Sequence, residues 1–149
     1  MNSDFKKNNI DRLSNIIERQ SILLSNASEE EYALKPTPDK WSKKEILGHL
    51  IDSAQNNIQR FIRGQYEKDS SIIYDQDRWV ELNRYRDATL AELVNLWKLL
   101  NDRIVRIIDA MPEGDLKNTS LIKGEKFTLE WLIEDYIKHL QHHLNQINT

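Results

Sequence analysis

The chain has 149 residues, 39% hydrophobic and 30% charged, with both signs of charge interspersed and a net charge of −3. This balance predicts one globular domain, residues 1–149, with a sizeable core, and it argues against a basic surface for nucleic acid or an acidic membrane. The absence of cysteine excludes disulfides, thiolate metal ligands and a protein thiol nucleophile. No apolar run approaches the ~18 residues of a membrane span and the first residues lack a signal-peptide core, so we expect a cytoplasmic protein.

The first half of the chain predicts two amphipathic helices. The first covers residues 4–25, with apolar side chains along one side (Ile10, Leu13, Ile17 and Leu24). The second begins at Ser42, which forms a capping box with Glu45, and its apolar stripe has seven members (Leu47, Leu50, Ile51, Ala54, Ile58, Phe61 and Ile62). At 100° per residue, His49 lies away from this stripe. Its side of the helix is therefore either solvent surface or the polar wall of a site.

A long connection, residues 65–87, follows the second helix and is rich in charged and aromatic residues. It is predicted to contain a short helix over residues 78–84. Connections of this length inside a domain are often functional. The four tryptophans are expected to lie in the core or to pack between helices (Trp41, Trp79, Trp97 and Trp131), with a place in the lining of a pocket as the alternative for Trp79. Three arginines are interpreted as solvated surface, with attraction of an anionic substrate as the alternative (Arg78, Arg84 and Arg86).

The second half of the chain predicts two more helices. A second capping box, Thr89 with Glu92, begins the third helix, which ends at Met111. Residues 115–127 are predicted to be a loop or a short hairpin, and the fourth helix begins near Thr128. Four amphipathic helices of about 20 residues predict an all-α four-helix bundle, in which the long connection joins the second and third helices.

Two histidines of the fourth helix, His139 and His143, are spaced i, i+4 and can chelate one metal ion if both point inward. Helical geometry places His143 inside the apolar stripe and His139 at its margin. His142 points further round and is the least suited to join them. A pair of core histidines with satisfied hydrogen bonds explains the spacing equally well, and a surface histidine explains His49 equally well.

Carboxylates lie one turn from two of these histidines. Metal-bound imidazoles usually donate their second N–H to a carboxylate or carbonyl. Asp52, one turn after His49, is therefore a candidate to orient a ligand or to act as base towards a water on the metal; an ordinary solvated carboxylate is an equally good interpretation. For Asp135, one turn before His139, the solvated interpretation is favoured. The sequence contains no glycine-rich phosphate loop and no Gly-x-Ser-x-Gly elbow.

Three segments carry a family resemblance. The stretch Lys40-Trp41-Ser42-Lys43-Lys44-Glu45-Ile46-Leu47-Gly48-His49-Leu50-Ile51-Asp52-Ser53, with Asn57 and Arg60-Phe61, resembles the second helix of the DinB/YfiT-like superfamily of metalloenzymes. Residues 74–79 and 136–143 are similar to the following segment and to the closing helix there. The resemblance spans nearly the whole chain. It implies an up-down-down-up bundle and a divalent metal site made by His49, His139 and His143, with His142 as a neighbour.

The resemblance says less about the reaction. Members are described as metal-dependent hydrolases, and some as transferases that use low-molecular-weight thiols such as bacillithiol or mycothiol; others have no known activity. Our leading hypothesis is a metalloenzyme, with zinc or nickel held by three neutral histidines and keeping its full +2 charge. Such an ion is a strong Lewis acid, able to activate water for a hydrolase or a thiol for an S-transferase.

We expect a small-molecule substrate and, because cysteine is absent, any thiol must come from a cosubstrate. No nucleic acid or membrane partner is expected. The expected assembly is a homodimer. The alternative is a non-catalytic, dimeric metal-binding or stress-response module. A metal-free helical interaction protein is a third interpretation, and it predicts that the three imidazoles lie far apart.

Overall fold

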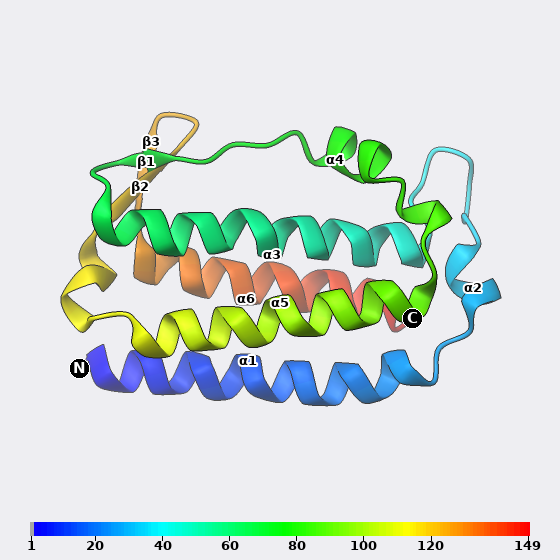
Figure 1. The fold of residues 1–149 in the computed structure, drawn as a ribbon, viewed down its shortest axis with the longest axis horizontal. Coiled ribbons are helices and arrows are strands. Elements are labelled where there is room, and N and C mark those ends of the chain that lie inside the picture. The colour runs from blue at the N-terminus through cyan, green and yellow to red at the C-terminus, as the bar shows by residue number, and fades with distance from the viewer. Residues whose placement is uncertain (1) are drawn as a thin grey trace.

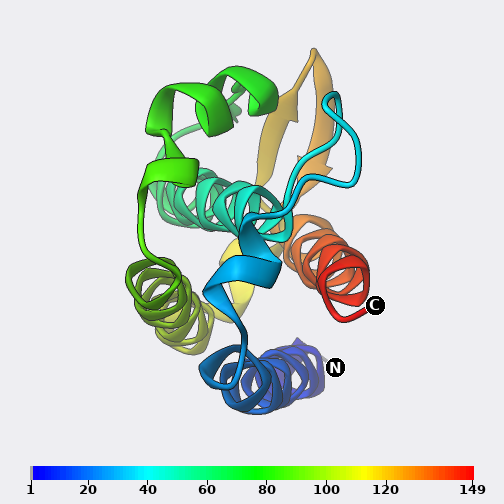
Figure 2. The same ribbon diagram turned by 90° about the vertical axis from the view of Figure 1, so that its right-hand side faces the viewer.

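Four long helices form a bundle in this computed structural model, which describes residues 2–149, with side chains from residue 4 onward. They are α1 (Asn2–Ser25), α3 (Lys43–Tyr66), α5 (Leu90–Ala110) and α6 (Leu129–Ile147). Figure 1 shows α1 and α6 running in one direction and α3 and α5 in the other. Seen end-on in Figure 2, α1 and α3 occupy opposite corners, and each packs against both α5 and α6. The predicted up-down-down-up bundle is confirmed.

The core consists of one apolar stripe from each long helix, as the periodicity predicted. Leu13, Ile51, Ile104 and Ile133, one from each helix, have no solvent exposure. Among the tryptophans, Trp97 is fully buried in this core.

Two residues predicted to pack inward lie at the surface instead. Ile62 is 43% exposed and Trp131 45% exposed. The ring of Trp131 lies against that of Phe127, with a centroid separation of 4.4 Å. Helical periodicity places Ile62 at the margin of its stripe, where only the neighbouring elements determine whether a side chain is covered. It places Trp131 on the side of α6 opposite the apolar stripe, so its exposure follows from the periodicity itself.

Polar side chains fix where the helices begin. Ser42 and Glu45 form the predicted capping box at α3, and each side chain bonds to the backbone N–H of the other residue. Thr89 caps α5 by accepting from the Glu92 amide. The predicted reciprocal bond from the Glu92 side chain does not form in the described structure, so α5 has a simple cap. Thr128 caps α6 in the same way.

The break after α1 contains a short helix, α2 (Glu29–Ala33), which the sequence analysis did not predict. The long connection runs back along the outside of α3, as Figure 1 shows. It contains the predicted short helix, which begins two residues earlier than expected, as α4 (Gln76–Asn83) followed by the 3-10 turn η1 (Tyr85–Asp87). We call residues 67–89 the crossover.

The hairpin alternative for residues 115–127 is confirmed. A 3-10 turn, η2 (Glu113–Lys117), leads into β2 (Thr119–Ile122) and β3 (Glu125–Thr128), which pair antiparallel. The turn between them uses positive φ at Lys123 and Gly124, 51° and 82°, as tight hairpins require. A two-residue strand of the crossover, β1 (Ser70–Ser71), adds in parallel to β2 and was not predicted. No described helix is long and apolar enough to cross a membrane.

Candidate metal centre

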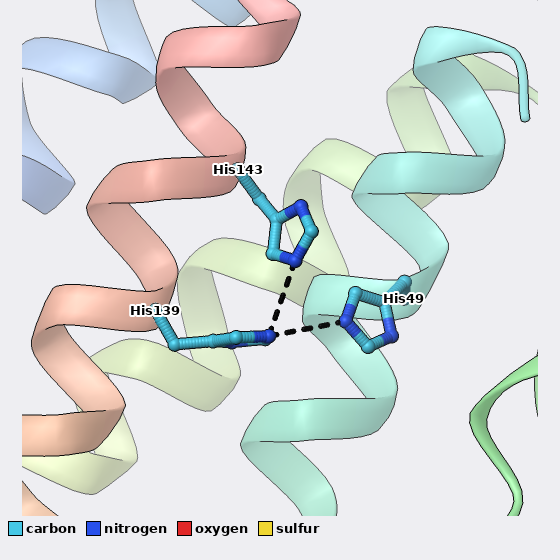
Figure 3. Close-up of side chains that lie close together, drawn as sticks. All are labelled: His49, His139 and His143. Atoms are coloured by element: carbon cyan, nitrogen blue, oxygen red, sulfur yellow. Dashed lines mark hydrogen bonds between the residues drawn. The ribbon is translucent and has the colours of Figure 1, made fainter.

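Three imidazoles from two helices meet between α3 and α6. His49 lies in the second turn of α3, and His139 and His143 lie one turn apart on α6. The Nε2 atom of His139 is 3.3 Å from Nε2 of His49 and 3.1 Å from Nε2 of His143 (Figure 3). One ligand atom from each residue lies within 4.8 Å of the others. The structure therefore brings together the three histidines that the sequence analysis selected, and it overturns the metal-free interpretation's expectation of separated rings.

The spacing of these nitrogens fits a shared cation. Tetrahedral coordination with metal–nitrogen bonds of 2.0–2.1 Å separates the ligand nitrogens by roughly 3.3 Å. Hydrogen bonding alone satisfies the group poorly, because a single N–H on Nε2 of His139 can point at only one of its two neighbours. Within the described chain, no fourth histidine or carboxylate joins the group. The donor set can thus hold a divalent ion and leave one position open, as catalytic sites do.

The environment keeps these histidines neutral. His49 is only 1% exposed, and burial, followed by the neighbouring His139 and His143, lowers its pKa to about 3. Burial, followed by His143, likewise lowers the pKa of His139 to about 4. The pKa of His143 is also lowered, mainly by burial, against the opposing hydrogen bond to Gln146. Neutral imidazole is the form that binds metal.

A residue that the sequence analysis did not select, Gln146, sets the proton position on His143. Its Oε1 atom lies 2.8 Å from Nδ1 of His143. Because an amide oxygen only accepts, Nδ1 carries the ring proton and Nε2 has a free lone pair towards the group. The i, i+3 spacing on α6 is the only sequence signal for this pair. His142 is exposed and lies outside the group.

Asp52 is fully buried, so the solvated interpretation of this carboxylate is wrong. Its Oδ1 atom accepts hydrogen bonds from the Tyr85 hydroxyl at 2.5 Å and the Asn83 amide at 3.2 Å. Burial raises the pKa of Asp52 to about 6, and the bond from Tyr85 opposes this change. Both Oδ2 of Asp52 and Nδ1 of His49 are buried without a partner in the described structure. Asp135 is exposed, as the favoured interpretation held.

The polar side of α3 around His49 is therefore buried and is not solvent surface. Ser53 and Asn56 are 3% and 2% exposed, and the indole of Trp41 lies against His49 with a centroid separation of 5.1 Å. Trp79 is partly buried against Tyr74 in the crossover, at 5.6 Å. The three arginines interpreted as surface are exposed (Arg78, Arg84 and Arg86). Two of them form ion pairs with nearby carboxylates of the crossover, Glu81 and Asp87.

Two Bacillus proteins are similar to this chain in sequence. A Bacillus mycoides (strain KBAB4) protein named "Putative metal-dependent hydrolase" is 28% identical over 113 residues, which are 73% of this chain and 64% of that protein. The Bacillus subtilis (strain 168) protein of the same name, YfiT, is 26% identical over 110 residues, 72% of this chain and 62% of its own. The chain thus spans less than two thirds of the length of these relatives.

Two solved structures have the same fold. The YfiT structure, whose description gives an unusual four-helix bundle topology, has a TM-score of 0.84 at 22% identity, covering 96% of this chain and 83% of YfiT. The mycothiol-dependent maleylpyruvate isomerase has a TM-score of 0.77 at 11% identity, covering 93% of this chain and 59% of that protein. The DinB superfamily matches residues 12–147, nearly the whole bundle, and the chain belongs to this superfamily.

Proposed function

We propose that this protein is a divalent-metal-dependent hydrolase of a small molecule, with the ion held by Nε2 of His49, His139 and His143. The observation that carries the proposal is the convergence of three neutral imidazoles without a fourth protein ligand in the described chain. The names of the two Bacillus relatives support the same reaction class.

The residues of the site have separate tasks in this proposal. A divalent ion with three uncharged ligands keeps its +2 charge and supplies a Lewis acid that lowers the pKa of water. Gln146 holds the His143 tautomer that leaves Nε2 free, and burial keeps His49 unprotonated at neutral pH. Trp41 covers one side of the His49 ring. The buried Asp52 is bonded to Tyr85 and Asn83 and not to a ligand imidazole, which favours a positioning role over that of base.

An S-transferase that uses a low-molecular-weight thiol is the second candidate function. The absence of cysteine means that the thiol comes from a cosubstrate, and the fold matches that of an isomerase described as mycothiol-dependent. The same Lewis acid would favour the thiolate form of such a cosubstrate. Zinc and nickel both suit an all-imidazole site. We further propose a cytoplasmic location and a homodimer; sedimentation analysis of the purified protein tests the homodimer.

Metal analysis of purified variants tests the ligand assignment. We expect close to one transition-metal ion per chain in the parent and in His142→Ala, because the His142 ring lies outside the group. His49→Ala and His143→Ala should lose most of the metal, since each removes one of three ligands. Equal metal content in all four proteins contradicts the assignment.

A substrate screen then separates the two reactions. Cleavage of esters or amides that depends on the metal and needs no thiol supports the hydrolase. Turnover of electrophiles only when a small thiol is added supports the transferase instead. Full metal content with an open position but no turnover in either screen favours the non-catalytic module.

A further inference from the structure

A row of polar residues continues along α3 from the three-histidine group. Ser53, Asn56 and Arg60 follow His49 at steps of four, three and four residues, which keeps all of them on one face of the helix. Ser53 and Asn56 are buried, and Arg60 is partly buried. Burial lowers the pKa of Arg60, whereas Tyr74 of the crossover and then Asp135, one turn before His139 on α6, act to raise it. The row therefore leads from the histidines to an arginine that contacts the crossover.

Arg60 is held in place without a carboxylate partner. Its Nη2 donates to the carbonyl of Ile72 in the crossover at 2.7 Å, and its Nη1 lies 3.4 Å from Oδ1 of Asn57. Its Nε is buried and has no partner in the described structure. The ion pairs that arginines form in the described chain involve other residues (Arg63, Arg78 and Arg84). A guanidinium removed from water and left without an anion costs free energy, and a ligand that brings its own anion removes that cost.

We propose that Arg60 binds an oxyanion of the substrate, a carboxylate or a phosphate group, while the reacting end of the same molecule lies at the three-histidine group. The guanidinium lies at the level of Asn57, eight residues along α3 from His49, which corresponds to about 12 Å at 1.5 Å per residue. The substrate class is thus an elongated acid with its charge at the end remote from the reacting bond. This inference rests on the proposed metal-dependent function, and its test keeps the two apart.

The first test uses hydroxamates, which chelate metal ions, as probes on the zinc-loaded protein. Each probe carries a terminal carboxylate, phosphonate or uncharged carboxamide on an alkyl chain of varied length. In calorimetric titrations, we expect an acid-tailed probe to bind about tenfold more tightly than its carboxamide counterpart, with an optimum near a span of about 12 Å. Comparing the two acid tails identifies the preferred oxyanion.

Variants assign the effect to Arg60. Arg60→Gln should remove the advantage of the acid tail, Arg60→Lys should keep part of it, and the control Arg63→Gln should keep all of it, because Arg63 already pairs with Glu67. The short probe acetohydroxamate should bind all four proteins equally, which shows that the three-histidine site is intact. An equal advantage of the acid tail in the parent and in Arg60→Gln overturns the inference.

A second test does not depend on metal. Pimelate, a dicarboxylate without a hydroxamate, is titrated into the metal-free, ¹⁵N-labelled protein while the Nε–H resonance of Arg60 is followed by NMR. A saturable shift supports the oxyanion site, even if acetohydroxamate fails to bind and the metal proposal falls. No shift together with no preference for acid tails refutes the oxyanion site, whatever the metal does.

Discussion

The buried position of Asp52 disfavours the ionised form of its carboxyl group. It has no solvent exposure, and burial raises its pKa to about 6. A carboxyl group whose folded pKa exceeds its unfolded value of 3.8 binds its proton more tightly in the folded state. Its contribution to stability is thus fully present below pH 3.8 and is lost as the pH rises through about 6. At neutral pH, the ionised Asp52 destabilises the fold.

Asp52→Asn should therefore stabilise the protein, because the amide keeps an acceptor for Tyr85 and carries no charge. We expect the free energy of unfolding to rise by about 1–3 kcal/mol at pH 8, and by less at pH 5, in urea titrations of the metal-free protein. Asp109→Asn, at an exposed position, should change it by less than about 0.5 kcal/mol at either pH. A loss of stability in Asp52→Asn at pH 8 would contradict this account of the charge.

Gly48 allows Tyr85 to reach Asp52. A Cβ atom at position 48 would lie 2.2 Å from Cδ2 and 2.5 Å from Cγ of the Tyr85 ring. Gly48→Ala must displace that ring, so we expect a loss of about 1–3 kcal/mol despite the better helix propensity of alanine. Gly114→Ala, where nothing lies within 4 Å, serves as the control and should be nearly neutral. Thermal unfolding of both variants provides the measurement.

For single residues, the sequence predicts which side of a helix a side chain lies on, but not whether water or protein surrounds that side. The i, i+4 spacing was sufficient to predict that His139 and His143 point the same way. It could not decide whether the polar side of α3, with His49, met water or protein, since that depends on the distant crossover. The role of Gln146 was missed for a similar reason, because a glutamine three residues after a histidine near the end of a helix is common on solvated surfaces.

Among the elements, α2, α3 and α5 are joined by one buried lysine. Lys44 is 4% exposed, and its Nζ donates to Oε1 of Glu29 at 2.6 Å and to the carbonyl of Ala88 at 2.8 Å. The other oxygen of Glu29 accepts from the amide of Leu90, the first residue of α5. The end of the crossover is therefore held against the first turn of α3.

Lys44→Met should weaken the contact that Lys44 makes between α2, α3 and the start of α5, without unfolding any of these helices. We expect amide hydrogen exchange in the first turn of α5 to accelerate roughly tenfold, with the middle of α5 unchanged, because the loss is local. Lys43→Met is the matched control, since the Lys43 side chain is 24% exposed and its ion pair is with the exposed Glu31. Uniform acceleration along α5 would indicate global destabilisation and contradict a local joint.

Helix positions were largely predictable, because capping residues and apolar periodicity are local signals. The joint at Lys44 was not predictable, since its partners lie 15 and 44 residues away. The strand β1 was missed because two serines carry no alternating pattern, and their pairing depends on the hairpin fifty residues later.

For the whole molecule, the direction of the helices makes the crossover necessary. Since α3 and α5 run the same way, the chain must return along the length of the bundle between them. That length is roughly 30 Å, the length of the 21-residue helix α5. The returning segment covers the outer face of α3, through Tyr85 on Gly48 and Ile72 on Arg60. The number and length of the four long helices could be predicted from periodicity, but this order of directions came only from the family resemblance.

The proposed centre should couple metal binding to the pH dependence of the whole fold. The folded pKa values of His49 and His139, about 3 and about 4, lie below the unfolded value of 6.5. Their contribution is full above pH 6.5 and is lost as the pH falls towards 4, so we expect the metal-free protein to lose about 1–2 kcal/mol between pH 7 and pH 5. Because protonation of Asp52 has the opposite effect, the loss should be clearest in the Asp52→Asn background.

Zinc should raise stability at pH 7 by about 2.7 kcal/mol at a free concentration one hundred times Kd, and the gain should fade on acidification as the ligands take up protons. Urea titrations with and without zinc provide the measurement. His139→Gln should abolish the gain, whereas His142→Gln should retain it. A zinc effect of equal size in both variants would argue for adventitious binding elsewhere.

The indole of Trp41 lies against the ring of His49, with 5.1 Å between centroids, so the fluorescence of Trp41 should report which metal ion occupies the proposed centre. An open-shell cation such as Ni²⁺ quenches the emission of an adjacent indole, whereas closed-shell Zn²⁺ does not. Adding nickel should therefore dim the intrinsic fluorescence in proportion to occupancy, and Trp41→Phe should remove the response while leaving the other three tryptophans bright. Loading and chelation can then be followed in real time without any attached dye.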